Sequence, residues 1–176
     1  MRKKLAEKEF VNYKKDQGVS LTNKGKLAAK MIEKKHRWWE VFLVEKLDFS
    51  WDEVHDIAEQ LEHIKSEKLI NTLDDFLGNP TEDPHGDPIP DANGQMIKID
   101  KQLLSELMQN QTGICVGVKD TSSEFLKYLD KQEIALGSKI EFVSKETFDL
   151  SLKIKVDGRD LTVSNKIASN LFVKVI

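Results

Sequence analysis

The chain has 176 residues, of which 39% are hydrophobic and 32% are charged, with a net charge of −3. This size suits one or two domains, and the composition excludes a disordered or collagen-like chain. The sequence has no run of about 18 apolar residues that could span a bilayer. Its start, MRKKLAEKEF, lacks the apolar segment of a secretory signal. We therefore expect a cytoplasmic protein without a membrane partner.

Charge is distributed unevenly along the chain. Residues 1–35 contain eleven Lys and Arg against four Asp and Glu, whereas the remainder contains 16 against 26, so the two parts carry net charges of +7 and −10. A basic N-terminal segment on an acidic body indicates a polyanion-binding arm joined to a cation-binding body. A solvated, lysine-rich helix would give the same N-terminal pattern, and charge alone does not separate the two interpretations.

The first half of the chain is predicted to be mainly helical. Helical spacing of apolar residues, without an interrupting proline, predicts helices over residues 2–10, 22–47, 50–64 and 66–77. Ser50 and Glu53 have the capping-box spacing that would start the third of these helices, and Gly78 would end the fourth. Residues 10–22 predict a small β-hairpin around the turn KKDQG.

The second half is predicted to be a small β-barrel that carries one helix. A loop over residues 79–94 contains all four prolines. It is followed by a short helix near residues 103–108 and by strands over residues 112–118, 148–156 and 159–164. Thr121 and Glu124 have capping-box spacing, and Asp157-Gly158 predicts a hairpin turn. Cys115, in the apolar run GICVGV, is expected to be a buried and inert thiol.

Histidine and glutamate side chains gather beside the apolar stripe of the segment VHDIAEQLEHI. At about 100° per residue, one polar arc of this helix would hold His55, Glu59, Glu62 and His63. His36 and Glu40 repeat the His-x-x-x-Glu spacing on the preceding helix. Imidazole and carboxylate groups that converge from two helices can hold a divalent ion. A solvated polar helix face is the alternative interpretation.

The run KHRWWEVFLVEKLDFSWDEVHDIAEQLEHIKSEKL, followed by PHGDPIP, closely resembles the diphtheria toxin repressor family of metal-dependent transcriptional regulators. The resemblance implies an α+β fold. A helical metal-binding and dimerisation domain would cover residues 23–97, and a small FeoA-type, Src-homology-3-like β-barrel would cover residues 98–176. Residues 1–22 would be the remnant of a winged helix-turn-helix, namely the end of its recognition helix and its wing. About forty residues of that domain, with most of the base-reading surface, would then be missing.

The resemblance also implies two metal sites. The primary, activating site would be formed by Glu59, Glu62 and His63. The ancillary site would be formed by His36, Glu40, His55, Asp83, His85 and Asp120. Glu59 occupies the position at which manganese-responsive members have glutamate and iron-responsive members have cysteine, and carboxylate oxygens suit Mn(II). We therefore expect Mn(II), with Fe(II) or another divalent transition metal as competitor. A solvated turn residue at His85 and a helix cap at Asp120 are structural alternatives.

The function implied by the resemblance is that of a manganese-dependent repressor. It would bind double-stranded operator DNA as a homodimer and control metal-uptake genes. Phosphate contacts are expected from Arg2, Lys3, Lys4, Lys14 and Lys15. The alternative is a dimeric metal-binding protein that cannot read DNA and acts as a metal buffer or as the inactive partner of an intact homologue. No hydrolase motif supports a metallohydrolase, so an enzyme is not expected.

Overall fold

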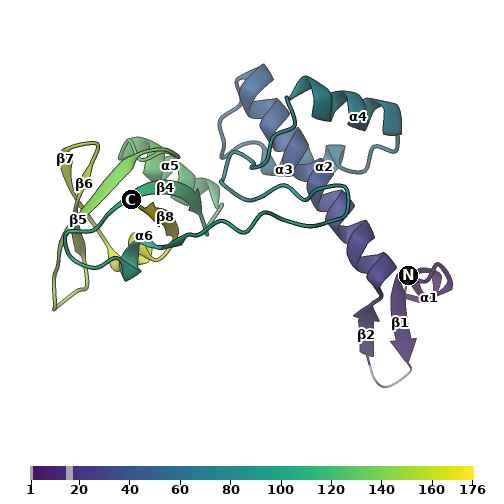
Figure 1. Cartoon of the computed structure of the whole chain (residues 1–176), viewed down its shortest axis with the longest axis horizontal. Helices are drawn as coiled ribbons and strands as arrows, with labels where there is room; N and C mark the ends of the chain where they lie inside the picture. The colour runs from purple at the N-terminus through teal and green to yellow at the C-terminus, as the bar shows by residue number, and fades with distance from the viewer. Residues whose placement is uncertain (1, 15–17) are drawn as a thin grey trace. The chain divides into compact units, whose positions relative to one another are not determined.

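The chain forms two compact units (Figure 1), in a computed structural model that describes residues 2–14 and 18–176. The first unit comprises Met1–Phe49, Val54–Asp83 and Pro88–Ile97. The second unit comprises Ser50–Glu53, Pro84–Asp87 and Lys98–Ile176. Helices dominate the first unit and antiparallel strands dominate the second, so the predicted α+β fold, helical part first, is confirmed.

The first unit opens with a short helix and a hairpin. Helix α1 (Arg2–Glu7) leads into strand β1 (Val11–Lys14), which pairs with the antiparallel strand β2 (Gly18–Leu21). These two strands form a sheet of their own. The predicted N-terminal helix, here shorter than expected, and the pairing of the two hairpin strands are therefore confirmed. Residues 15–17 of the predicted turn lie outside the described residues.

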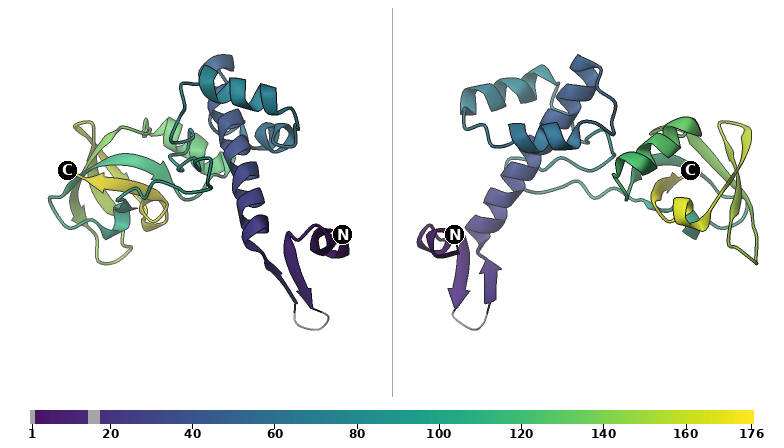
Figure 2. Two further views of the ribbon diagram at one scale, coloured as in Figure 1. Left: turned by 45° about the vertical axis from the view of Figure 1, so that its right-hand side comes forward. Right: turned by 180° about the vertical axis from the view of Figure 1, so that it is seen from behind.

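A single long helix follows the hairpin directly (Figure 2). Helix α2 (Asn23–Leu47) has Thr22 as its N-cap residue, whose hydroxyl oxygen accepts a hydrogen bond from the Gly25 amide at 3.0 Å. Such a cap satisfies one of the amides that a helix start leaves unpaired. Asp48, in the left-handed conformation with φ of 57°, ends the helix. The bounds agree with the prediction made from periodicity.

Helices α3 (His55–Leu61) and α4 (Glu67–Phe76) complete the helical part. The start of α4 at the cap residue Ser66 is as predicted. In contrast, α3 is shorter at both ends than the predicted helix of residues 50–64. Because α3 ends at Leu61, the two predicted ligands Glu62 and His63 follow the helix instead of lying on its face.

The predicted helix start at Ser50 is wrong. Ser50 and Glu53 close a separate turn, in which the Glu53 amide donates to the Ser50 carbonyl at 3.0 Å. The Ser50 amide in turn donates to the Glu53 carboxylate at 3.3 Å. The groups of the predicted capping box are thus used within this turn, and the helix begins only at His55.

A small apolar core holds the three helices together. Its buried side chains are Trp38, Trp39, Val41, Ala58, Ile70, Leu73 and Ile89. The Trp39 ring stands edge-on to the Phe42 ring, with 5.7 Å between the centroids, a favourable aromatic geometry. Because α2, α3 and α4 all contribute side chains to this core, the core fixes the packing of α2 against α3.

The second unit contains a six-stranded antiparallel sheet in the order β3-β8-β4-β5-β6-β7. The strands are β3 (Gln102–Leu103), β4 (Thr112–Val118), β5 (Lys139–Lys145), β6 (Leu152–Val156), β7 (Arg159–Val163) and β8 (Leu171–Val175). Asp157 and Gly158, both with positive φ, join β6 to β7 as predicted. Helix α5 (Ser123–Lys131) buries Leu126 and Leu129 in the core of this unit.

Two local predictions in the β part are wrong. The capping box at Thr121 does not form, because Ser122 is the N-cap residue of α5 and the Asp120 carboxylate accepts from its amide. The strand predicted over residues 148–156 is confined to β6. Leu150, with φ of 60°, interrupts the extended backbone before β6 begins.

Other elements of the β part are shorter than expected or were not predicted. The helix expected near residues 103–108 is one 3-10 turn, η1 (Leu104–Glu106). Strands β5 and β8 and the short helix α6 (Asn165–Ala168) were not predicted from the sequence. The sequence signal that was available is the alternation of polar and apolar residues in KIEF, whose Ile140 and Phe142 are buried.

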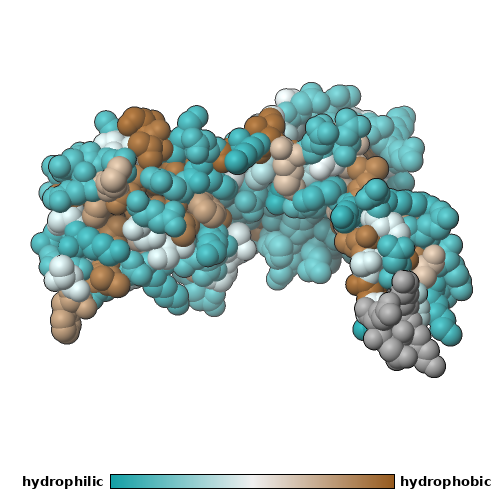
Figure 3. Space-filling model, turned by 60° about the horizontal axis from the view of Figure 1, so that its bottom comes forward, coloured by the Kyte–Doolittle hydropathy of each residue, from teal (hydrophilic) through white to brown (hydrophobic). Residues whose placement is uncertain are grey.

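The surface shown in Figure 3 is largely hydrophilic, with hydrophobic side chains in small groups. Large exposed apolar side chains include Phe76, which is 61% exposed, and Phe148, which is fully exposed. Within residues 2–14 and 18–176, none of the helices combines the length and the apolar character that crossing a bilayer requires.

The thiol of Cys115 is predicted to be inert in the folded chain. Cys115 lies on β4 and is 1% exposed, and its burial raises the pKa of the thiol to about 11. We expect iodoacetamide at about pH 8 to modify the native chain at least about 100-fold more slowly than the chain unfolded in guanidinium, as measured by mass spectrometry. Similar rates in both states would show that β4 does not protect this thiol.

Candidate metal centre

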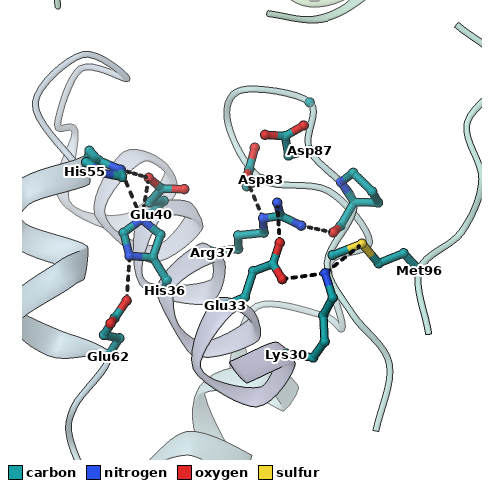
Figure 4. Close-up of polar contacts among 12 residues, drawn as sticks. Lys30, Glu33, His36, Arg37, Glu40, His55, Glu62, Asp83, Asp87 and Met96 are labelled. Carbon is teal, nitrogen blue, oxygen red and sulfur yellow. Dashed lines mark hydrogen bonds and ion pairs between the residues drawn. The ribbon is translucent and has the colours of Figure 1, made fainter. Parts of the chain in front are cut away.

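Helices α2 and α3 bring His36, Glu40 and His55 to one point (Figure 4). The i, i+4 spacing of the first two directs both side chains to the same side of α2. His36 Nε2 lies 3.1 Å from Glu40 Oε1 and 3.2 Å from His55 Nδ1, and His55 Nδ1 lies 3.4 Å from Glu40 Oε1. We refer to these three residues as the α2–α3 triad.

The separations within the α2–α3 triad suit ligands of one metal ion. Neighbouring ligands at about 2.1 Å from an octahedral ion are about 3 Å apart. At 3.2 Å, lone pairs on His36 Nε2 and His55 Nδ1 would repel each other. A proton or a cation between the two nitrogens removes this repulsion. Imidazole nitrogen and carboxylate oxygen are ligands of Mn(II), Fe(II) and Zn(II). The triad is therefore a candidate site for a divalent ion.

Burial differs sharply across the α2–α3 triad. The side chain of Glu40 is 3% exposed, that of His36 is 15% exposed and that of His55 is 59% exposed. A buried carboxylate is unfavourable unless positive charge and hydrogen bonds surround it. The triad therefore has a deep anionic end at Glu40 and an open end at His55, through which an ion and its waters could enter.

Glu62 supports the triad from the other side of His36. Its carboxylate accepts a hydrogen bond from His36 Nδ1 at 2.9 Å, which fixes the ring and turns Nε2 toward Glu40. Burial is the largest single influence on the pKa of His36 and lowers it. The hydrogen bonds and charges of Glu40 and Glu62 together outweigh burial, so the pKa of His36 lies above its ordinary value. A metal ion bound at Nε2 must displace the second proton of the charged ring, the one on Nε2, so acid opposes metal binding.

Two other predicted primary ligands lie at the surface. Glu59 is exposed on α3, and His63, whose side chain is 69% exposed, follows α3. His63 Nε2 lies 3.7 Å from Glu62 Oε1. Among the described residues, Glu59, Glu62 and His63 do not form a convergent ligand group like the α2–α3 triad. Their role as a primary site stays a prediction.

The three predicted ligands from the loop and the β part each have a protein partner. Asp83 Oδ2 lies 3.3 Å from Arg37 Nε. His85 is 3% exposed, so its ring is not solvated; its Nε2 donates to the Trp51 carbonyl at 2.8 Å, and the two rings stack. Asp120 accepts from the backbone amide two residues later, and this bond holds the pKa of its carboxyl below the ordinary value. Their role as ligands also stays a prediction.

A partly buried arginine beside the site was not predicted from the sequence. Arg37, which follows His36 on α2, pairs with Glu33 at 2.9 Å and with Asp83, and it donates to the Pro88 carbonyl (Figure 4). The i, i+4 spacing of Glu33 and Arg37 is a usable signal for the first pair. The contacts with Asp83 and Pro88 tie the proline-rich loop to α2 and need the tertiary structure.

Comparison with known proteins identifies both parts of the chain. Residues 22–91 match the iron dependent repressor, metal binding and dimerisation domain, and residues 102–175 match the FeoA domain. A solved manganese-dependent transcriptional repressor in complex with manganese is 34% identical, with a TM-score of 0.86, and the match covers 99% of this chain and 82% of that one. The chain belongs to the diphtheria toxin repressor family. The family consists of transcriptional regulators, in agreement with the prediction that the chain is not an enzyme.

Curated relatives share a shorter stretch with this family member. The iron-dependent repressor IdeR of Mycobacterium tuberculosis is 41% identical over 65 residues, which are 37% of this chain and 28% of that protein. A probable metal transport system membrane protein of Chlamydia trachomatis is 44% identical over 61 residues, which are 35% of this chain and 14% of that protein. The chain thus matches less than a third of the length of either relative.

Replacing Glu62 by Gln is expected to weaken Mn(II) binding by about 10- to 100-fold, because the amide loses the charge that orients and polarises His36. A Mn(II) titration followed by electron paramagnetic resonance of the free ion measures the affinity. Glu45→Gln is the matched control, since Glu45 is an exposed carboxylate on α2 that pairs with Lys46. Unchanged affinity in Glu62→Gln would contradict the supporting role of this carboxylate.

Proposed function

We propose that this chain is a manganese-responsive transcriptional regulator that acts as a homodimer on operator DNA and controls metal-uptake genes. The observation that carries the proposal is the α2–α3 triad, whose ligand atoms from two helices lie 3.1–3.4 Å apart. A site whose ligands already converge can bind an ion without a large rearrangement. Such a site suits a sensor whose output follows the free metal concentration.

We propose Mn(II) as the regulatory ion. Glu40 within the triad, Glu62 bonded to His36 and Glu59 on α3 offer the hard carboxylate oxygens that suit Mn(II). A further support is that the solved repressor at 34% identity holds manganese. Fe(II) is the main competitor, because divalent affinities rise from Mn(II) to Fe(II) at most sites.

A second ion completes the proposed sensor. We propose that its ligands are Glu59, Glu62 and His63, and that Asp83, His85 and Asp120 add to the ancillary site. Glu62 lies between the two sets, since it accepts a hydrogen bond from His36 and lies 3.7 Å from His63. An ion at either set would therefore change the charge and the orientation of side chains at the other.

We infer that an apolar face on α2 and α4 forms the dimer contact. A groove of about 270 Å³ on this face is lined by Trp39, Phe42, Leu69, Thr72, Leu73 and Phe76. Phe76 is 61% exposed and Leu69 is 42% exposed in the single chain, and a second copy would cover both. The domain that carries this face matches a metal-binding and dimerisation domain.

We infer that the N-terminal basic residues contact DNA phosphates. Arg2, Lys3 and Lys4 are exposed on α1, and Lys14 is the last residue of β1. Lys15 lies outside the described residues. Each cation that neutralises a phosphate releases a counterion, so affinity supplied by these residues falls steeply with salt.

A bound ion could act on the hairpin through α2, which carries two of the ligands. It would supply positive charge between Glu40, His36 and His55 and so tie α2 to α3. The hairpin β1–β2 precedes the start of the same helix. In a dimer, ordered α2 helices would hold two hairpins at a fixed spacing for two DNA half-sites. Metal can shift the equilibrium between hairpins at this spacing and hairpins at other spacings. It does so only as far as its affinities for the two arrangements differ.

A dimeric metal-binding protein without DNA-reading ability is the second candidate. The observation that favours it is that the matched domains cover residues 22–91 and 102–175, so neither match includes the basic residues before Thr22. Such a protein would bind Mn(II) through the same triad and would dimerise through the same face. It would show no metal-dependent preference for any DNA sequence.

Selection from a pool of random-sequence duplexes, with Mn(II) or with a chelator, tests the proposal. We expect a two-fold symmetric sequence to be enriched only with Mn(II), because the ion fixes the spacing of the two copies. Glu40→Gln should lose this response, and Glu45→Gln should keep it. Replacing Arg2, Lys3 and Lys4 by Ala should reduce the salt slope of binding by about 0.9 for each phosphate that the variant no longer neutralises.

Enrichment that is equal with Mn(II) and with chelator would contradict the regulatory proposal. If Mn(II) still binds and no sequence is enriched, the second candidate is correct. Phe76→Asp separates dimerisation from metal binding. It should lower the mass measured by light scattering to that of one chain while the triad, which does not include α4, still binds Mn(II).

A further inference from the structure

A tight backbone contact joins the hairpin to the first turn of α2. The Thr22 amide donates to the Phe10 carbonyl at 3.1 Å, and the Thr22 hydroxyl donates to the Glu9 carbonyl at 2.6 Å. Lys24 Nζ lies 3.6 Å from the Glu9 carboxylate and 5.3 Å from the centre of the Phe10 ring. The segment before β1 is therefore held on the start of α2 by contacts from Thr22 and Lys24.

Gly25 lies at the centre of this contact and leaves no room for a side chain. A Cβ added to Gly25 would overlap the Phe10 carbonyl oxygen and would lie 2.9 Å from the carbonyl carbon, closer than the 3.0 Å that real Cβ contacts respect. The Leu21 side chain would also be only 3.2 Å away. Two of these three neighbours are backbone atoms, so the contact can be relieved only by moving the hairpin away from the helix.

Helix geometry gives no local reason for glycine at this position. Gly25 has no positive φ, and it lies within the first turn of a regular α-helix. In such a position alanine ordinarily gives a more stable helix than glycine. The close approach of the Phe10 carbonyl is thus the feature that requires glycine here.

We propose that Gly25 is a positioning residue, which fixes the direction of the hairpin relative to the metal-binding part of α2. The helix continues without interruption from Gly25 to His36 and Glu40, a distance of about 16 Å to the first of these. A rigid contact at the first turn of this helix, with an ion held farther along it by His36 and Glu40, would couple the direction of the hairpin to the metal site. The regulatory role of this contact rests on the proposed function. The joint itself, by which we mean the contact of the Phe10 carbonyl with Gly25, can be tested without DNA.

The experiment compares Gly25→Ala with the exposed neighbour Lys26→Ala. Spin labels at Ser20→Cys on β2 and Glu45→Cys on α2 report the distance between hairpin and helix, and the buried Cys115 stays unlabelled. We expect Gly25→Ala to shift or broaden the distance distribution and to leave the Mn(II) affinity unchanged. Its Mn(II)-dependent DNA affinity should fall by about tenfold or more, whereas Lys26→Ala should match the wild type in label distance and Mn(II) affinity.

A second variant is needed because the added methyl group of Gly25→Ala could simply unfold the hairpin. Thr22→Asp keeps a good helix cap but lacks the hydroxyl that donates to Glu9, so it should loosen the joint without adding bulk. A wild-type distance distribution in both variants would overturn the inference. If the wild type shows no Mn(II)-dependent DNA binding, the proposed function fails, and the label distances still decide whether Gly25 sets the joint.

Discussion

The buried carboxylate of Glu40 is the group on which the arrangement of the helical part depends. Its side chain is 3% exposed, and a carboxylate in such a place needs positive charge and hydrogen bonds nearby. His36 and His55 lie 3.1 and 3.4 Å from its Oε1. Because they come from α2 and α3, the same electrostatic requirement favours the contact between these helices. A divalent ion would meet it more fully, so that metal binding and helix packing become coupled.

Local chemistry explains which elements could be predicted from the sequence. The predicted helix starts at Thr22 and Ser66 are confirmed. Both residues cap their helices, and a cap needs only a side-chain oxygen and amides a few residues away. The same reasoning failed at Ser50, where Ser50 and Glu53 close a separate turn and the residue after Ser50 makes a long-range contact. Trp51 Nε1 donates to Asp130 at 3.0 Å, within the second unit. These contacts belong to the fold as a whole and leave no periodic signal in the sequence.

The residues of the candidate site likewise include some whose positions the sequence predicted and some whose positions it did not. Spacing within one helix predicted that His36 and Glu40 share a face, and the family resemblance grouped His55 with them. The structure brings all three side chains together. The position of Glu62 was not predictable from periodicity, because it depends on where α3 ends. The ion pair of Arg37 with Asp83 was also out of reach, since it depends on how the proline-rich loop returns to α2.

The central claim is that the α2–α3 triad binds Mn(II). Anomalous diffraction at the manganese absorption edge, from crystals grown with Mn(II), tests it most directly. We predict a peak within bonding distance of His36 Nε2, Glu40 Oε1 and His55 Nδ1, with Glu62 still bonded to the other nitrogen of His36. Manganese peaks elsewhere, with none among these three side chains, would contradict the account.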